Sequence, residues 1–185
     1  MTPVVVDADA VHCMRTFGLL EHVSKTPLPP LVCTGYVAHH ELNPLASEVA
    51  AWEAAGLLRV ESIPTRSPAS RMRRALRERH RGIDKGETEM IAWILACSPT
   101  TPLVSCDVRA RAIAAQERIV AWDVLDLVHE WLACSIVAIE DARRCVLPWL
   151  DDPKARWRPR DFDGLELTLR NRYQDAYLQP FQHRS

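Results

Sequence analysis

The chain has 185 residues, of which 48% are hydrophobic and 25% are charged, and this composition excludes wholesale disorder. Its formal net charge of -1 gives no general argument for nucleic-acid or membrane binding, so any such argument must rest on local charge. No apolar run approaches the roughly 18 residues that span a bilayer, and the N-terminus lacks the basic and apolar regions of a signal peptide. We therefore expect a cytoplasmic protein without membrane contact.

The predicted elements alternate between short apolar strands and helices. The predicted strands are 4–6, 31–33, 57–63, 103–106 and 119–121. The predicted helices are 10–23 (interrupted at Gly18), 34 or 35 to 42, 45–55, a basic helix 71–81, 85–97, 108–117, 123–134 and 139–150. This alternation predicts an α/β domain with a parallel sheet and helices on both faces.

A boundary is predicted at the turn-forming sequence Asp151-Asp152-Pro153. Residues 1–150 would form one domain, and residues 151–185 a polar C-terminal extension of unknown role with one helix over 165–178. The six cysteines include no C-x-x-C pair and the seven histidines no H-x-x-x-H pair, so no zinc site is predicted and the cysteines are interpreted as buried thiols.

Acidic residues follow two of the predicted strands directly. Val4–Val6 ends on Asp7 and the strand 103–106 ends on Asp107. In an open parallel sheet, ligands bind outside the carboxyl ends of the strands. Two further acids, Glu41 and Glu87, fall in or near the starts of short helices. Oxygen ligands without a Cys/His set suit Mg²⁺ or Mn²⁺, and such ions suit phosphodiester hydrolysis.

Each of these acids also has an ordinary structural interpretation. An aspartate after a strand often caps the next helix, and a glutamate in a first helical turn favours the helix dipole. The order of the set favours a site over isolated structural roles. Crowding of these carboxylates without a metal would raise at least one pKa.

Four segments carry a resemblance to a known family: VVVDADAVHCM, VAHHEL, GIDKGETEMIAWILA and PLVSCDVRARAIAAQERIVAWDVLDLV. Together they resemble the PIN-domain family of metal-dependent ribonucleases, which includes the VapC-like toxins of toxin–antitoxin pairs. The resemblance covers about residues 3 to 135. It implies a three-layer α/β/α fold with a short parallel sheet, followed here by the C-terminal helical extension.

The resemblance also implies a function and a ligand set. The protein would cut RNA with Mg²⁺ or Mn²⁺, with an antitoxin as a possible partner and a homodimer as a possible assembly. The residues that match the family's catalytic metal ligands are Asp7, Glu41, Glu87 and Asp107.

Three other acids remain open as members of this site. Asp9 stands where the family usually has a small hydroxyl residue or Asn, so it is either an additional ligand or a helix cap. Asp84 competes with Glu87, which is three residues away, for the third position; Glu87 is preferred because it opens the apolar-periodic segment. Asp123, after the last strand, is either a further ligand or a helix cap.

The segment from Arg66 to Arg81 contains seven arginines and few acids to pair with them. Arginine binds phosphate bidentately, and such a stripe can neutralise several backbone phosphates. The predicted nucleic-acid contacts are Arg71, Arg73, Arg74, Arg77 and, directly after the second strand-end aspartate, Arg109. A solvated helix face, or a surface that receives an acidic partner protein, is an equal alternative for the segment. Arg109 and Arg111 either hold a phosphate or form surface salt bridges.

Three alternatives to a nuclease were weighed. A PIN-like regulatory or protein-binding module would keep the fold without activity. A nucleotide-binding domain is disfavoured because the chain has no G-x-G-x-x-G and no G-x-x-x-x-G-K-[ST] motif. A phosphatase with Asp7 as nucleophile and Asp9 as acid would leave Glu41 and Glu87 without a role.

Overall fold

The computed structural model describes residues 3–23 and 31–151 of the chain. The predicted C-terminal helix 165–178, with the rest of the predicted extension beyond residue 151, lies outside the described residues.

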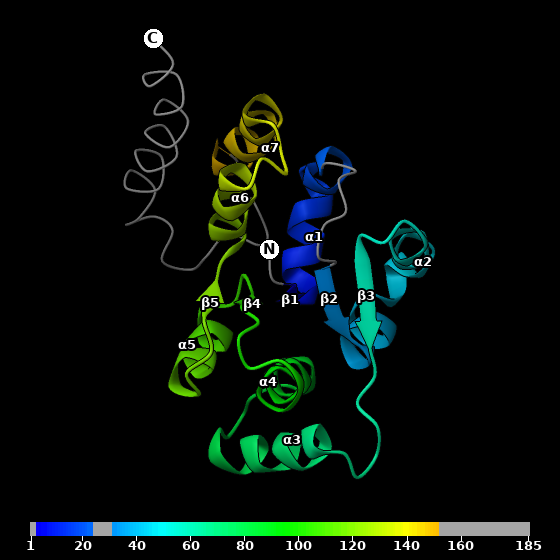
Figure 1. The fold of residues 1–185 in the computed structure, drawn as a ribbon, viewed down its shortest axis with the longest axis vertical. Coiled ribbons are helices and arrows are strands. Elements are labelled where there is room, and N and C mark those ends of the chain that lie inside the picture. Colours follow the sequence, from blue (N-terminus) through cyan, green and yellow to red (C-terminus); the bar gives the residue numbers. More distant parts are fainter. Residues whose placement is uncertain (1–2, 24–30, 152–185) are drawn as a thin grey trace.

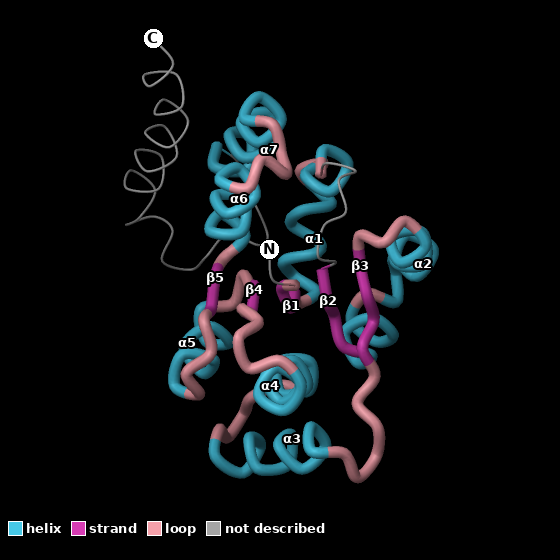
Figure 2. The backbone as a smooth tube through the Cα atoms, in the orientation of Figure 1, coloured by secondary structure: helices cyan, strands magenta, loops and turns pink. Residues whose placement is uncertain are grey.

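A five-stranded sheet forms the middle layer, and all of its paired strands are parallel (Figures 1 and 2). Its strands are β1 (Val4–Val6), β2 (Leu31–Thr34), β3 (Leu58–Glu61), β4 (Leu103–Val104) and β5 (Ala121–Trp122). Their order is β3-β2-β1-β4-β5, so the first strand lies at the centre. The predicted α/β class with a parallel sheet is confirmed.

Helices cover both faces of this sheet. They are α1 (Ala8–Thr16), α2 (Ala46–Ala54), α3 (Pro68–Arg79), α4 (Lys85–Cys97), α5 (Val108–Gln116), α6 (Val124–Ala133) and α7 (Ile139–Asp151), with the short turns η1 (Leu19–His22), η2 (Val37–Glu41) and η3 (Asn43–Leu45). Figure 1 shows α1, α6 and α7 on one side of the sheet and α4 and α5 on the other, with α3 packed outside α4. Within the described ranges, none of the helices has the length and apolar character to span a membrane.

Several predicted boundaries differ from the structure. The predicted interruption at Gly18 is confirmed, because α1 ends at Thr16 and Gly18 takes a left-handed φ of +69°. The strand predicted over 103–106 is shorter, Leu103–Val104, and the strand predicted over 57–63 is Leu58–Glu61. The basic helix begins three residues earlier than predicted, at Pro68, because the Ser67 hydroxyl accepts a hydrogen bond from the Ser70 amide and caps it. The last strand lies at 121–122 instead of 119–121.

The central strand, β1, is buried on both faces and fixes the edge of the sheet at which Asp7 lies. Val4, Val5 and Val6 are at most 2% exposed, because helices cover both faces of β1. On α4, Ile91 and Ile94 are fully buried against the same core. Burying one such side chain contributes roughly 1.5–3 kcal/mol. The residues that directly follow β1 and β4 are therefore held on a well-packed platform.

Candidate functional site: an acidic pocket at the carboxyl edge of the sheet

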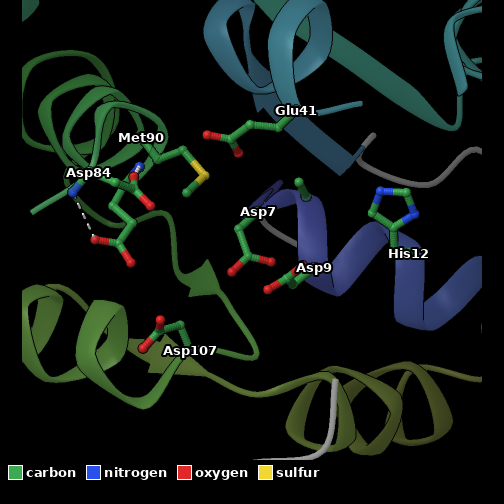
Figure 3. A pocket seen from close by; sticks show the side chains of 9 residues that line it. Asp7, Asp9, His12, Glu41, Asp84, Met90 and Asp107 are labelled. Carbon is green, nitrogen blue, oxygen red and sulfur yellow. Dashed lines mark hydrogen bonds between the residues drawn. The ribbon is translucent and has the colours of Figure 1, made fainter. Parts of the chain in front are cut away.

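A pocket of about 360 Å³ opens where β1 and β4 end (Figure 3). Its lining residues are Asp7, Ala8, Asp9, His12, Glu41, Asp84, Glu87, Met90 and Asp107. The structure thus brings together six of the seven carboxylates that the sequence singled out, all except Asp123, from the start of α1, the η2 turn, the start of α4 and the start of α5. We call this site the acidic pocket.

Asp7 is the buried member of the acidic pocket. Its Oδ1 accepts a hydrogen bond of 2.6 Å from the Ala10 amide, so Asp7 also caps α1. The Ser105 hydroxyl donates a hydrogen bond to its Oδ2. The same hydroxyl oxygen accepts a 3.0 Å hydrogen bond from the Asp107 amide. Ser105 therefore links the two strand-end aspartates, a role that its place within an apolar strand did not reveal.

Asp107 caps α5 in the same manner, and its Oδ1 accepts a 2.6 Å hydrogen bond from the Arg109 amide. In contrast to Asp7, the Asp107 side chain is exposed. The structural and functional interpretations of these aspartates are therefore compatible. Capping the helix places the carboxylate at the edge of the sheet, where a ligand would bind.

Asp84 and Glu87 form a reciprocal capping box at the start of α4. The Glu87 amide donates to Asp84 Oδ1 at 2.8 Å, and the Asp84 amide donates to Glu87 Oε2 at 3.4 Å. Asp84 and Glu87 were predicted as alternatives for one position of the site. Both side chains line the acidic pocket. The positive end of the α4 dipole favours negative charge at this position.

Two structural features place Glu41 at the acidic pocket, and neither was predicted from the sequence. It lies in a π-helical turn that the hydrogen bond from the Leu42 amide to the Val37 carbonyl closes at 2.8 Å. Its carboxylate packs against the α4 backbone at Gly86, where an added Cβ atom would overlap Glu41 Oε1 and lie 2.9 Å from Glu41 Cδ. A Cβ atom at position 86 would therefore displace the Glu41 carboxylate from this position. The Gly86-Glu87 pair is visible in the sequence, but nothing in the sequence indicates that Gly86 lies against Glu41.

Glu89, one helical turn after Lys85, anchors the segment that carries Glu41. Its Oε2 accepts a 2.7 Å hydrogen bond from the Tyr36 amide, directly before the η2 turn. Its Oε1 accepts a 3.0 Å hydrogen bond from the Arg73 guanidinium on α3. Glu89 is only 6% exposed, and it connects α3, α4 and the η2 turn. This buried glutamate was not among the predicted residues.

Two further lining residues, His12 and Met90, were also not predicted. His12 follows Asp9 by three residues on α1, a spacing that places both on one side of the helix. Figure 3 shows Asp7 and Asp9 at the centre of the view and His12 one turn further along α1. Asp123 is not a lining residue of the acidic pocket. Its Oδ1 instead accepts from the Asp126 amide at 2.8 Å, so its helix-cap interpretation is the one the structure supports.

Burial and mutual repulsion raise the pKa of three pocket carboxyls. Burial raises the pKa of Asp7 to about 7, and the charges of Asp9 and Glu41 add to this effect. Burial likewise raises the pKa of Glu41 to about 7, with further contributions from Asp84 and Asp9. The prediction that at least one carboxyl would have a raised pKa is confirmed.

Glu87 is the third such group. Its pKa is raised to about 7, chiefly by burial and then by the charges of Asp84 and Asp107, while the hydrogen bond from the Asp84 amide and the charge of Arg109 oppose the rise. Protons retained near pH 7 thus moderate the negative charge of the acidic pocket.

The chemistry of the donor set fits a hard divalent cation, because all six charged groups offer carboxylate oxygens. As the side chains lie, no three His, Cys, Asp or Glu residues within 3–23 and 31–151 are grouped to hold an ion. Repulsion among carboxylates opposes closer approach unless a cation offsets it. Asp7, with hydrogen bonds to both oxygens, is the member already held in place.

The arginines predicted to contact nucleic acid divide into two groups. Arg73, one of the predicted contacts, is paired with Glu89 at 3.0 Å. Arg79, in the same segment but not a predicted contact, is paired with Glu117 at 3.0 Å, so acids outside the segment engage two of its arginines. Arg77 is exposed on α3, and Arg71 and Arg74 line a second pocket that is treated below.

The two arginines after Asp107 bind backbone carbonyls. Arg109 Nη2 donates to the Arg81 carbonyl at 2.9 Å and lies against Gly82, which ties the loop before α4 to α5. Arg111 Nη1 donates to the Ser105 carbonyl at 2.7 Å. These contacts of Arg109 and Arg111 are with backbone carbonyls, whereas one of the two predicted alternatives was a surface salt bridge. The charge of Arg109 also lowers the pKa of Glu87 at the acidic pocket.

Comparisons of the chain with models of protein families, with curated proteins and with solved structures found no match.

Proposed function

We propose that the protein is a metal-dependent nuclease of the PIN type that hydrolyses phosphodiester bonds in RNA. One observation carries this proposal: six carboxylates from four separate segments line one pocket at the carboxyl edge of a parallel sheet. Structural caps alone do not account for the set, because Glu41 caps no helix and yet lines the pocket, with its carboxylate against the α4 backbone at Gly86.

In this proposal Asp7, Glu41, Glu87 and Asp107 hold Mg²⁺ or Mn²⁺, and Asp9 and Asp84 assist them. When bound, such an ion supplies Lewis-acid polarisation of the scissile phosphate and activation of a water molecule. Ser105 orients Asp7 through its hydroxyl and restrains Asp107 through its backbone amide. Arg109, held at the rim by the Arg81 carbonyl, provides positive charge toward the substrate phosphate.

RNA as the substrate, an antitoxin as the partner and a homodimer as the assembly are proposed from the resemblance of the four segments quoted above. A protein that cleaves RNA with an open carboxylate site would require restraint in its cell, and a partner protein that covers the acidic pocket would provide it. Binding of such a partner is expected to exclude RNA from the same pocket.

A second candidate function has a specific observation in its favour. Asp7, Asp84, Glu87 and Asp107 all serve as helix caps or capping-box partners, so each has a structural reason to be present without catalysis. A catalytically inactive PIN-like module that binds a protein would retain these caps.

RNA cleavage with matched variants separates the two candidates. Labelled single-stranded RNA is incubated with Mg²⁺, with Mn²⁺ or with EDTA, using wild type, Asp7→Asn and Asp107→Asn, with Glu53→Gln on α2 as the exposed-acid control. Asparagine keeps a cap acceptor but loses the charge. We expect metal-dependent cleavage by wild type and the control, and a loss of about 100-fold or more in both Asp variants, in the range of removing a key electrostatic group. Undiminished cleavage by both Asp variants would exclude the assigned site, and wild type without cleavage would favour the inactive module.

A further inference from the structure

A second pocket, of about 530 Å³, lies on the outer helix α3 and on the turn before it. Its lining residues are Thr65, Arg66, Ser70, Arg71, Arg74, Ala75 and Glu78. Three guanidinium groups and two hydroxyls therefore meet around one concavity, with a single carboxylate among them. We call this site the basic pocket.

Helical spacing and a fixed turn build the basic pocket. Ser70, Arg74 and Glu78 follow one another at steps of four residues, so they share one face of α3. Arg66, in the preceding turn, has a left-handed φ of +66°. Its carbonyl accepts a 3.1 Å hydrogen bond from Arg71 Nη1, which holds the Arg71 side chain over the turn.

The other arginines of α3 show what is special about this face. Arg73 is engaged by Glu89, and Arg79 by Glu117, so these two hold the helix against the rest of the protein. Arg71 and Arg74 are exposed and line the basic pocket instead. The helix thus has one set of arginines that stabilises the fold and another that surrounds an open cavity.

We propose that the basic pocket binds a backbone phosphate of a nucleic-acid strand, at a position separate from the bond that is cleaved. This inference rests on the proposed function and specifies where the substrate is held. Guanidinium forks and hydroxyls are donors that match phosphate oxygens. Phosphate contacts of this kind position a strand without reading its sequence.

The composition of the basic pocket favours a nucleic acid over an acidic protein. Protein interfaces have a dehydrated centre enriched in aromatic residues and Met, whereas nucleic-acid interfaces are polar and strongly positive. Ala75 is the one apolar residue in the lining. A protein partner would find charge here but no apolar anchor.

Helix α3 lines the basic pocket and leads along the chain to the acidic pocket. The helix packs on α4, and its C-terminal end leads through residues 80–83 to Asp84 in the acidic pocket. With a rise of 1.5 Å per residue, Arg71 lies about 12 Å along the helix axis from Arg79. A strand seated in both pockets would run past the C-terminal end of α3, so the basic pocket would act on substrates that extend beyond the cleaved bond.

Binding measured without metal tests this inference separately from cleavage. The probe is a fluorescein-labelled single-stranded oligoribonucleotide of about 12 nucleotides, titrated by anisotropy in EDTA at several salt concentrations. The test variant is Arg71→Gln/Arg74→Gln. The matched control is Arg59→Gln/Arg144→Gln, which removes two exposed arginines on β3 and α7.

We expect the test variant to raise Kd about 10-fold or more and to lower the salt slope by about 1, because each lost phosphate contact on a single strand contributes about 0.7 to that slope. The control should stay within about 2-fold of wild type. Equal weakening by both pairs would overturn the inference, and so would displacement of the RNA by polyglutamate that is as effective as displacement by unlabelled RNA.

The failures of the two proposals are distinguishable. RNA that binds through the basic pocket but is never cleaved with Mg²⁺ or Mn²⁺ overturns the nuclease and supports the pocket. Metal-dependent cleavage together with unchanged RNA binding by Arg71→Gln/Arg74→Gln overturns the pocket and leaves the nuclease standing.

Discussion

The acidic pocket and the basic pocket differ in how the protein holds their charged groups. In the acidic pocket, carboxylates are fixed by caps, by Ser105 and by backbone packing at Gly86, and burial raises three pKa values to about 7. In the basic pocket, the arginine side chains are exposed, and Arg71 is held by a backbone carbonyl. Precise, partly desolvated charge is suited to chemistry on a bound group. Exposed, adaptable charge is suited to holding a flexible strand.

Gly86→Ala is expected to have the largest effect on RNA cleavage, and it tests whether the carboxylates of the acidic pocket must be held in place. The added Cβ displaces the Glu41 carboxylate, while alanine favours the helix by as much as about 1 kcal/mol over glycine. We expect RNA cleavage to fall about 100-fold with an unchanged or higher melting temperature. The measurement is cleavage of single-stranded RNA beside thermal unfolding.

Gly56→Ala is the matched control for this glycine. Gly56 follows α2 at a φ of +72° with no atom near its added Cβ, so alanine there is strained but touches no site residue. It should lower stability by about 1 kcal/mol while cleavage by the folded protein is retained. If the two variants lose activity alike, Gly86 has no specific role in placing Glu41.

A pH effect on stability tests the burial of the acidic pocket. The folded protein holds a proton on Asp7 up to about pH 7, whereas the unfolded chain releases it near pH 4, so the folded state binds more protons in between. The free energy of unfolding in EDTA should therefore fall as pH rises from 5 to 8. The effect is confined to the two pH units between 5 and about 7, so at about 1.4 kcal/mol per unit Asp7 alone accounts for at most about 3 kcal/mol of this fall.

Asp7→Asn should reduce that fall, because it removes the ionising group and keeps an amide oxygen for the α1 cap. Chemical denaturation of both proteins at pH 5 and pH 8 provides the measurement. A wild type whose stability is constant or rises over this range would show that the acidic pocket is not desolvated as described.

A smaller effect is expected from Arg73→Gln, which removes an arginine that faces Glu89 instead of the basic pocket. The loss leaves Glu89 without its ion-pair partner, so we expect about 1 kcal/mol lower stability, discounted because Arg73 is 44% exposed. RNA binding in EDTA should weaken by less than about 2-fold. A loss of binding as large as that of Arg71→Gln/Arg74→Gln would remove the distinction between the two faces of α3.

Features set by neighbouring residues were predictable from the sequence. The strand Val4–Val6, the aspartates at 7 and 107, and the helix Lys85–Cys97 each follow from local patterns of apolar, capping and turn residues. The topology rule for parallel sheets then brings the ends of β1 and β4 to one edge. These patterns placed Asp7 and Asp107 together at one edge, whereas Glu41 and Glu87 were assigned to the same site from the family resemblance.

Features that depend on contacts between distant segments were not predictable. Glu41 meets Gly86 and Glu89 meets Tyr36 across more than 40 residues, and no local pattern specifies such pairs. The pairing of Arg73 with Glu89 required knowledge of how α3 packs on α4. Ser105 lies between apolar neighbours in sequence, and its bridge between Asp7 and Asp107 exists only because β1 and β4 are adjacent.

The central claim, that the acidic pocket holds a divalent cation, is tested most directly by titration calorimetry with Mn²⁺ at pH 7. Wild type and Asp107→Asn would be compared in two buffers of different ionisation enthalpy. Because protonated carboxyls in the pocket must ionise to bind the ion, we predict binding by wild type with release of protons, and at least about 10-fold weaker binding by Asp107→Asn. Equal Mn²⁺ affinity of the two proteins, or no heat of binding by wild type at millimolar Mn²⁺, would contradict the account.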